Sequence, residues 1–211
     1  MKRISWFLTL LLLLASCETN KKAKASGKYF IAFYFRYIED TGEMTAELVP
    51  AKGSEAGKAK PAHLPGDVHI NSLLLTEGGG QMNLPLKYSA QFSGALPPKI
   101  ELQIAGLDTI PLTPAAVPQL SIRQEQSEIE LRAGASLGGD SRLILTFSDD
   151  TGNAITRTVK GPVSFPIRQK IPVWDAPVHL SVVVQREEKH TTDRLSLQAR
   201  LEYYLREVVL Q

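Results

Sequence analysis

Two runs near the carboxyl end alternate apolar and polar residues with a period of two. In residues 178–186 four apolar positions share one face, and in residues 195–205 six do. This period places the apolar side chains on one side of a β-strand, so we predict a pair of strands here. The alternative at the tail is a helix, one face of which would hold Leu201, Tyr204, Leu205, Val208 and Val209.

Shorter strand-like runs fill the rest of the chain. Residues 29–37 are dense in aromatic and β-branched side chains, and with the turn 39–42 and the run 44–49 they predict a hairpin. Turn residues 148–153 predict a second hairpin. Residues 51–66 and 161–177 are expected to be irregular because small residues, glycine and proline are frequent there. Further strands are expected over 68–75, 82–92, 99–104, 120–123, 128–132, 142–147 and 154–159.

Closely spaced short strands with no segment that requires a helix indicate an all-β protein. We predict two tandem β-sandwich domains, immunoglobulin-like, over residues 28–113 and 119–211. The division rests on a connector over residues 110–118 that contains three prolines, and on lysine predominating in the first block and arginine in the second. One continuous sandwich is the alternative.

The amino terminus has the order of an export signal. Basic residues 2–3 precede the apolar run 6–15, which is shorter than the roughly 20 residues needed to cross a bilayer. The sequence Leu14-Ala15-Ser16-Cys17 follows. Together these features resemble the signal peptide and lipobox of bacterial lipoproteins. The alternative is an ordinary secretory signal with an unrelated cysteine.

The resemblance implies a lipid anchor at Cys17. In that family the signal, here residues 1–16, is cleaved between Ser16 and Cys17, and the cysteine sulfur carries a diacylglyceryl group. Two or three acyl chains, at about 0.8 kcal/mol per buried methylene, would hold the protein firmly to a membrane. Cys17 is the only cysteine, so the remaining chain has no thiol for catalysis or for a disulfide.

Residues 17–27 are predicted to form a flexible tether, because they are polar and lack apolar periodicity. The ten residues 18–27 reach at most about 33–36 Å when extended, and their lysines can contact anionic headgroups. The sorting rules of the family point to the outer membrane, since Glu18 rather than aspartate follows the cysteine. The absence of an acidic run favours its periplasmic face over the cell surface.

Charge and composition narrow the classes of partner. The chain is 43% hydrophobic and 22% charged, which is typical of a globular protein and excludes collagen, coiled coil and complete disorder. Its formal charge of +2 comes from residues 2–3, so the chain without the signal is neutral. Nucleic acid is therefore not an expected partner.

The sequence contains no recognisable catalytic constellation. It lacks a GxSxG pentapeptide, a phosphate-binding glycine loop and histidines at zinc-site spacing. We therefore expect no catalytic residues, no metal and no cofactor. Residues 149–153 faintly resemble a calcium loop but lack its alternating oxygen ligands, so Asp150, like Asp40, is expected to cap a turn.

Two aromatic residues are candidates for contact with a partner. Tyr34 belongs to the aromatic strand, where core packing is the alternative, and Trp174 lies in a loop between prolines, where it could instead plug the sandwich. We expect a non-catalytic interaction or structural module that binds an envelope protein or glycan. The alternative is a polysaccharide- or peptide-binding protein, or a hydrolase, of the envelope. That alternative would gain from a cleft holding Tyr34, Trp174 and two acids.

Overall fold

A computed structural model describes residues 27–80, 85–115, 119–205 and 207–210. In this part of the chain the regular structure is β apart from one 3₁₀ turn, η1 (Ala56–Lys58). None of its helices is long and apolar enough to cross a membrane. The all-β sandwich class is confirmed, whereas the immunoglobulin-like subtype stays a prediction. The predicted signal, with Ser16 and Cys17, and the tether up to residue 26 lie outside the described residues.

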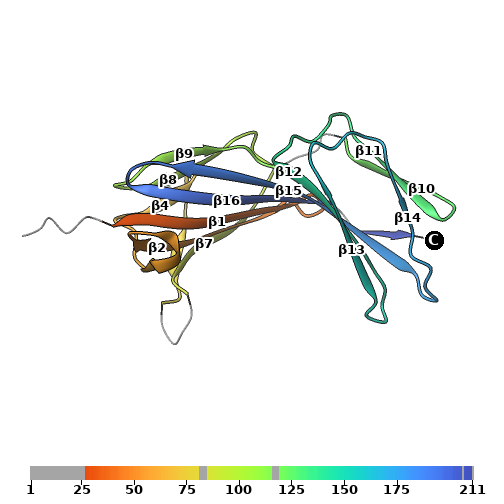
Figure 1. Ribbon diagram of the computed structural model, residues 1–211, viewed down its shortest axis with the longest axis horizontal. Coiled ribbons are helices and arrows are strands. Elements are labelled where there is room, and N and C mark those ends of the chain that lie inside the picture. The colour runs from red at the N-terminus through yellow and green to blue at the C-terminus, as the bar shows by residue number, and fades with distance from the viewer. Residues whose placement is uncertain (1–26, 81–84, 116–118, 206, 211) are drawn as a thin grey trace, which may run out of the picture.

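One ten-stranded sheet runs the length of the molecule (Figure 1). Its strands are β1 (Lys28–Ile38), β2 (Glu43–Gly53), β3 (Lys60–Pro61), β6 (Thr76–Gly78), β7 (Lys87–Ser93), β12 (Ser141–Ser148), β13 (Ala154–Lys160), β15 (Val178–Thr191), β16 (Leu195–Tyr204) and β17 (Val208–Leu210). Their order is β13-β12-β15-β16-β1-β2-β7-β6, with β17 beside β15 and β3 beside β2.

Two smaller sheets complete the sandwich. The first contains β4 (Val68–Ile70), β5 (Leu73–Leu74), β8 (Ile100–Ile104) and β9 (Thr109–Leu112). The second contains β10 (Ser121–Glu125), β11 (Glu128–Arg132) and β14 (Ile167–Lys170). The first lies beside β1 and β16, and the second beside β12 and β13 (Figure 1). Buried apolar side chains from all three sheets form one continuous core. Phe33 in β1, Ile100 in β8 and Ile129 in β11 are each at most 2% exposed.

The centre of the large sheet joins strands from opposite ends of the chain. β1 and β16 pair in parallel from Tyr29 opposite Leu195 to Ile38 opposite Tyr204. β15 pairs with β12 through its first half and with β16 through its second half. Strand pairing therefore crosses the predicted boundary between residues 28–113 and 119–211. Whether either block folds by itself remains a prediction.

The predicted hairpins are confirmed. β1 pairs antiparallel with β2, β12 with β13, and β15 with β16. The tail over 195–204 is a strand, so the helical alternative is wrong. Its alternate residues face the core, and that burial decides between the two periodicities.

Three local expectations need correction. The run 68–75 breaks into β4 and β5 because Asn71, at φ 54°, turns the chain. Pro111, assigned to a connector, lies in β9, an edge strand where its missing N–H is tolerated. The segments 51–66 and 161–177, expected to be irregular, contain the end of β2, η1, β3 and β14.

Candidate functional site

The turn between β12 and β13 is shaped by the carboxylate of Asp149. Its Oδ1 accepts hydrogen bonds from the backbone N–H groups of Thr151 (3.0 Å) and Asn153 (2.9 Å) and from the Thr151 hydroxyl (2.9 Å). Its Oδ2 accepts one from Asn153 Nδ2 (2.7 Å). Burial acts to raise the pKa of Asp149, but these hydrogen bonds outweigh it and lower that pKa. Asp149 therefore caps this turn, whereas the sequence pattern predicted Asp150 in that role.

Asp150 instead faces His179 at the start of β15. Nε2 of His179 lies 3.3 Å from Asp150 Oδ1, and Nδ1 lies 3.1 Å from Glu207 Oε1. The imidazole thus links the β12–β13 turn to the residue that precedes β17. This arrangement holds the turn against the body of the sheet.

A hollow of about 320 Å³ opens beside this turn, and Trp174 forms part of its wall. The loop between β14 and β15, which carries Trp174, and the β12–β13 turn lie toward the end of the molecule opposite the start of β1 (Figure 1). The remaining lining residues are Asp149, Thr151, Asn153, Val173, Asp175 and Ala176.

Trp174 has the properties of a preorganised contact residue. It is partly buried and packs against the hydrophobic core, so its ring is held in place before any partner arrives. Its neighbour Val173 is 94% exposed. A fixed indole loses little conformational entropy on binding and offers both an apolar face and an N–H donor. The carboxylate of exposed Asp175 adds a hydrogen-bond acceptor to the same hollow.

Tyr34 lies elsewhere and has partners within the sheet. Its hydroxyl donates a 2.7 Å hydrogen bond to Glu202 Oε2, which is also 3.0 Å from Arg36 Nη2. Nε of Arg200 lies 3.1 Å from the other oxygen of Glu202. Burial, followed by the hydrogen bond to Glu202, raises the pKa of Tyr34 far above its usual value. Tyr34 therefore bridges β1 and β16 and is not among the residues that line the Trp174 hollow.

A cleft holding Tyr34, Trp174 and two acids would favour a polysaccharide- or peptide-binding protein or a hydrolase, and the structure contains only part of it. Trp174 shares its hollow with two acids, Asp149 and Asp175, but not with Tyr34. Asp149 already accepts four hydrogen bonds from its own turn, which leaves Asp175 as the more available carboxylate. This geometry suits binding through a ring and polar groups better than acid–base chemistry between paired carboxylates.

A second hollow, of about 570 Å³, lies near the turns β8–β9 and β15–β16, and Asp67, His69, Asp108 and Arg194 help to line it. Two of these groups are engaged, because Asp108 accepts a hydrogen bond from Thr192 (3.3 Å) and Arg194 donates to the carbonyl of Gly106. Within the described ranges no group of three or more His, Cys, Asp or Glu side chains could hold a metal ion.

Comparisons with known proteins do not assign the chain to a family. No protein-family model matches it, and no curated protein matches it. The predicted export signal, the fold and the Trp174 hollow are therefore the basis for the function proposed below.

Proposed function

We propose that the protein is a lipoprotein of the bacterial cell envelope whose β-sandwich serves as a non-catalytic binding module. The observation that carries the proposal is the order of basic residues, short apolar run and Leu14-Ala15-Ser16-Cys17. Cys17 would bear the lipid, residues 18–27 would tether the sandwich, and the protein would occupy the periplasmic face of the outer membrane. A membrane and an envelope partner, and no nucleic acid, are the expected associations.

The Trp174 hollow is the proposed contact site for that partner. The tether joins the sandwich at the start of β1, and the hollow lies toward the opposite end of the molecule (Figure 1). An anchored protein would therefore present the hollow away from the lipid. Tryptophan is among the residues most common at the energetic centres of protein interfaces. The exposed Val173 beside Trp174 would enlarge the apolar contact.

An envelope glycan is the second candidate partner, and the polar lining of the hollow favours it. Sugar rings present C–H faces that stack on indole and hydroxyls that hydrogen-bond to carboxylates and amides. Trp174, Asp175 and Asn153 supply these groups in one hollow. A protein partner and a glycan would therefore use the same residues.

The anchor is tested by labelling with radioactive palmitate in a bacterium that processes lipoproteins. We expect label in the wild-type protein and none in Cys17→Ala, whose signal would also remain uncleaved. Label in both proteins would place acylation elsewhere, and label in neither would contradict the proposed anchor.

The binding site is tested by crosslinking in intact cells followed by purification of the adducts. Trp174→Ala should lose its adducts, whereas Leu74→Ala, which removes an apolar side chain 50% exposed on β5, should retain them. Titration with soluble cell-wall fragments tests the glycan, because Trp174 is the only tryptophan beyond Trp6 of the signal and its fluorescence reports the hollow. Adducts unchanged in Trp174→Ala, with fluorescence unchanged by the fragments, would contradict the site.

A further inference from the structure

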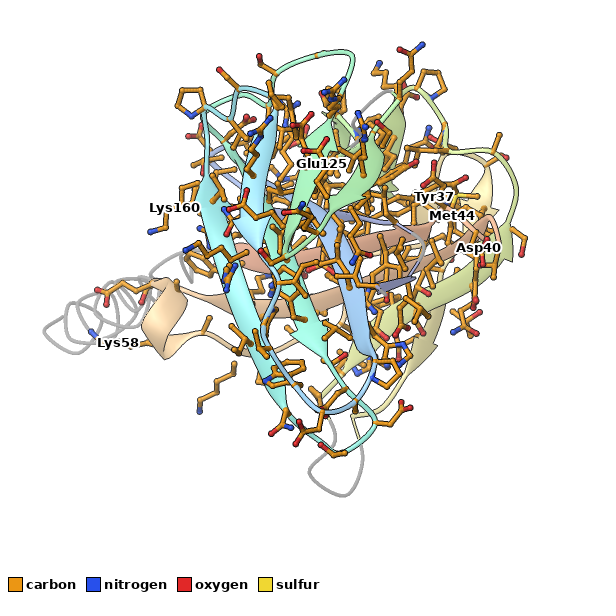
Figure 2. All side chains as sticks on the ribbon, turned by 90° about the vertical axis from the view of Figure 1, so that its right-hand side faces the viewer. Tyr37, Asp40, Met44, Lys58, Glu125 and Lys160 are labelled. Atoms are coloured by element: carbon orange, nitrogen blue, oxygen red, sulfur yellow. The ribbon has the colours of Figure 1, made fainter. Side chains whose placement is uncertain are left out.

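Lysines gather at the end of the large sheet where the chain enters it. Lys28 and the segment 50–61 together contain four lysines and one glutamate. That glutamate, Glu55, is 3.0 Å from Lys58 on η1, a residue that stands out from the side of the sheets (Figure 2). Lys28, Lys52 and Lys60 form no ion pair with any described residue, and we refer to these three as the lysine patch.

The strand register brings the three lysines to one end of the large sheet. Lys52 of β2 lies directly opposite Lys60 of β3, on the same face of the sheet. Lys28 of β1 lies opposite Gly53, the next residue of β2, so it belongs to the other face at the same end. Like charges at directly opposed positions of an antiparallel pair destabilise it. The ring of Tyr29, whose centroid is 4.7 Å from Lys52 Nζ, offsets part of this charge. An anion supplied from outside would remove the repulsion.

The described turn that adjoins the start of β1 does not neutralise the lysine patch. The turn between β15 and β16 adjoins β1 through a 2.9 Å hydrogen bond from Tyr29 N to Arg194 O. It carries Asp193 next to Arg194, so it adds no net charge. Because the chain without its signal is neutral overall, the lysine patch is a local separation of charge and not part of a basic surface.

We propose that the lysine patch docks on anionic phospholipid headgroups and orients the sandwich on the membrane. The proposal rests on the lipid anchor proposed above, because a tether of ten residues keeps this end of the sheet within reach of the bilayer. Lysines near an anionic membrane surface each add to its attraction, and the effect disappears beyond a Debye length of about 10 Å. With the lysine patch on the lipid, the Trp174 hollow faces away from it.

Vesicle sedimentation tests the patch without requiring acylation. The chain from residue 17 onward, with Cys17→Ser, is mixed with vesicles of phosphatidylglycerol and phosphatidylcholine or of phosphatidylcholine alone. We expect binding only to the anionic vesicles, and weaker binding as salt is raised. Lys52→Gln/Lys60→Gln should bind about 30-fold more weakly, from the loss of two lysines near the surface.

Lys160→Gln/Lys170→Gln is the matched control, since it removes two exposed lysines of β13 and β14 that lie away from the lysine patch. It should bind within about twofold of the parent, and circular dichroism should show both variants folded. Equal loss in the two variants, equal binding to both kinds of vesicle, or no binding at all would overturn the docking proposal. Each of these results would leave the palmitate test of the anchor unaffected.

Discussion

Tyr34 donates a 2.7 Å hydrogen bond to Glu202 across the parallel pair of β1 and β16, although 168 residues separate the two in sequence. The bond links a strand from the start of the sandwich to one near its end. Glu202 is only 6% exposed, and Arg36 and Arg200 approach the same carboxylate. One acidic group therefore holds together the outer face of the sheet at its central strand pair.

Replacing Glu202 with glutamine should lower the free energy of unfolding by about 1–3 kcal/mol, because hydrogen bonds to a charged group are lost and Tyr34 keeps a weaker acceptor. The arginines are 44% and 55% exposed, which keeps the loss below that of a fully buried ion pair. Urea denaturation measures it. Glu47→Gln, which removes the half-exposed pair with Lys87, should cost less than about 1 kcal/mol. Equal losses of unfolding free energy in the two variants would show that the Glu202 network stabilises the fold no more than a single surface ion pair does.

The block over residues 27–115 should not fold by itself. Without β16, the central strand β1 loses its parallel partner along its whole length, and the core around Phe33 and Phe35 loses Leu197 and Leu201. We expect the isolated block to show poor amide dispersion by NMR and no cooperative thermal transition, while the chain from residue 17 onward shows both. A cooperative transition in the isolated block would support two independent domains.

Gly161→Ala should destabilise the protein by about 1–3 kcal/mol, the usual range for overpacking. A β-carbon at this position would lie 2.0 Å from the carbonyl oxygen of Gly138 and 2.8 Å from that of Ser141, so the backbone would have to move. Gly57→Ala is the control, because a β-carbon there has no neighbour within 4 Å. A thermal melt of both variants checks the prediction, which fails if they shift the midpoint alike.

Asp149 should make the stability of the protein sensitive to acid. Its pKa is lowered in the folded state, so folding favours the charged form, and the stabilisation is complete above the ordinary carboxyl pKa of about 4. It is lost as the pH falls further, through the folded-state pKa. Asp149→Asn should therefore be less stable than wild type at pH 7, and the difference should shrink as the pH is lowered toward 3. A difference independent of pH would contradict this assignment.

Of the residues that line the candidate site, the sequence pattern indicated Trp174 but not the residues around it. Prolines on both sides of Trp174 marked it as a fixed loop residue. The pattern that identifies Asp149 as the turn cap is also present in the sequence, because the threonine and asparagine two and four residues after it are the donors it uses. Tyr34 was separated from Trp174 only by the fold, because residues on different strands meet or part according to strand order.

The period-two alternation by itself determined that the chain forms strands and which residues of 178–186 and 195–205 face a core, since side-chain direction along a strand is a local property. The order of basic residues, short apolar run and Leu14-Ala15-Ser16-Cys17 is likewise the whole basis for the anchor expected at Cys17. Only the tertiary structure decided that β1 pairs with β16 and that Trp174 meets the Asp149 turn. Each of these relationships joins strands or loops whose pairing depends on how the whole core packs, and no local pattern of residues encodes that choice.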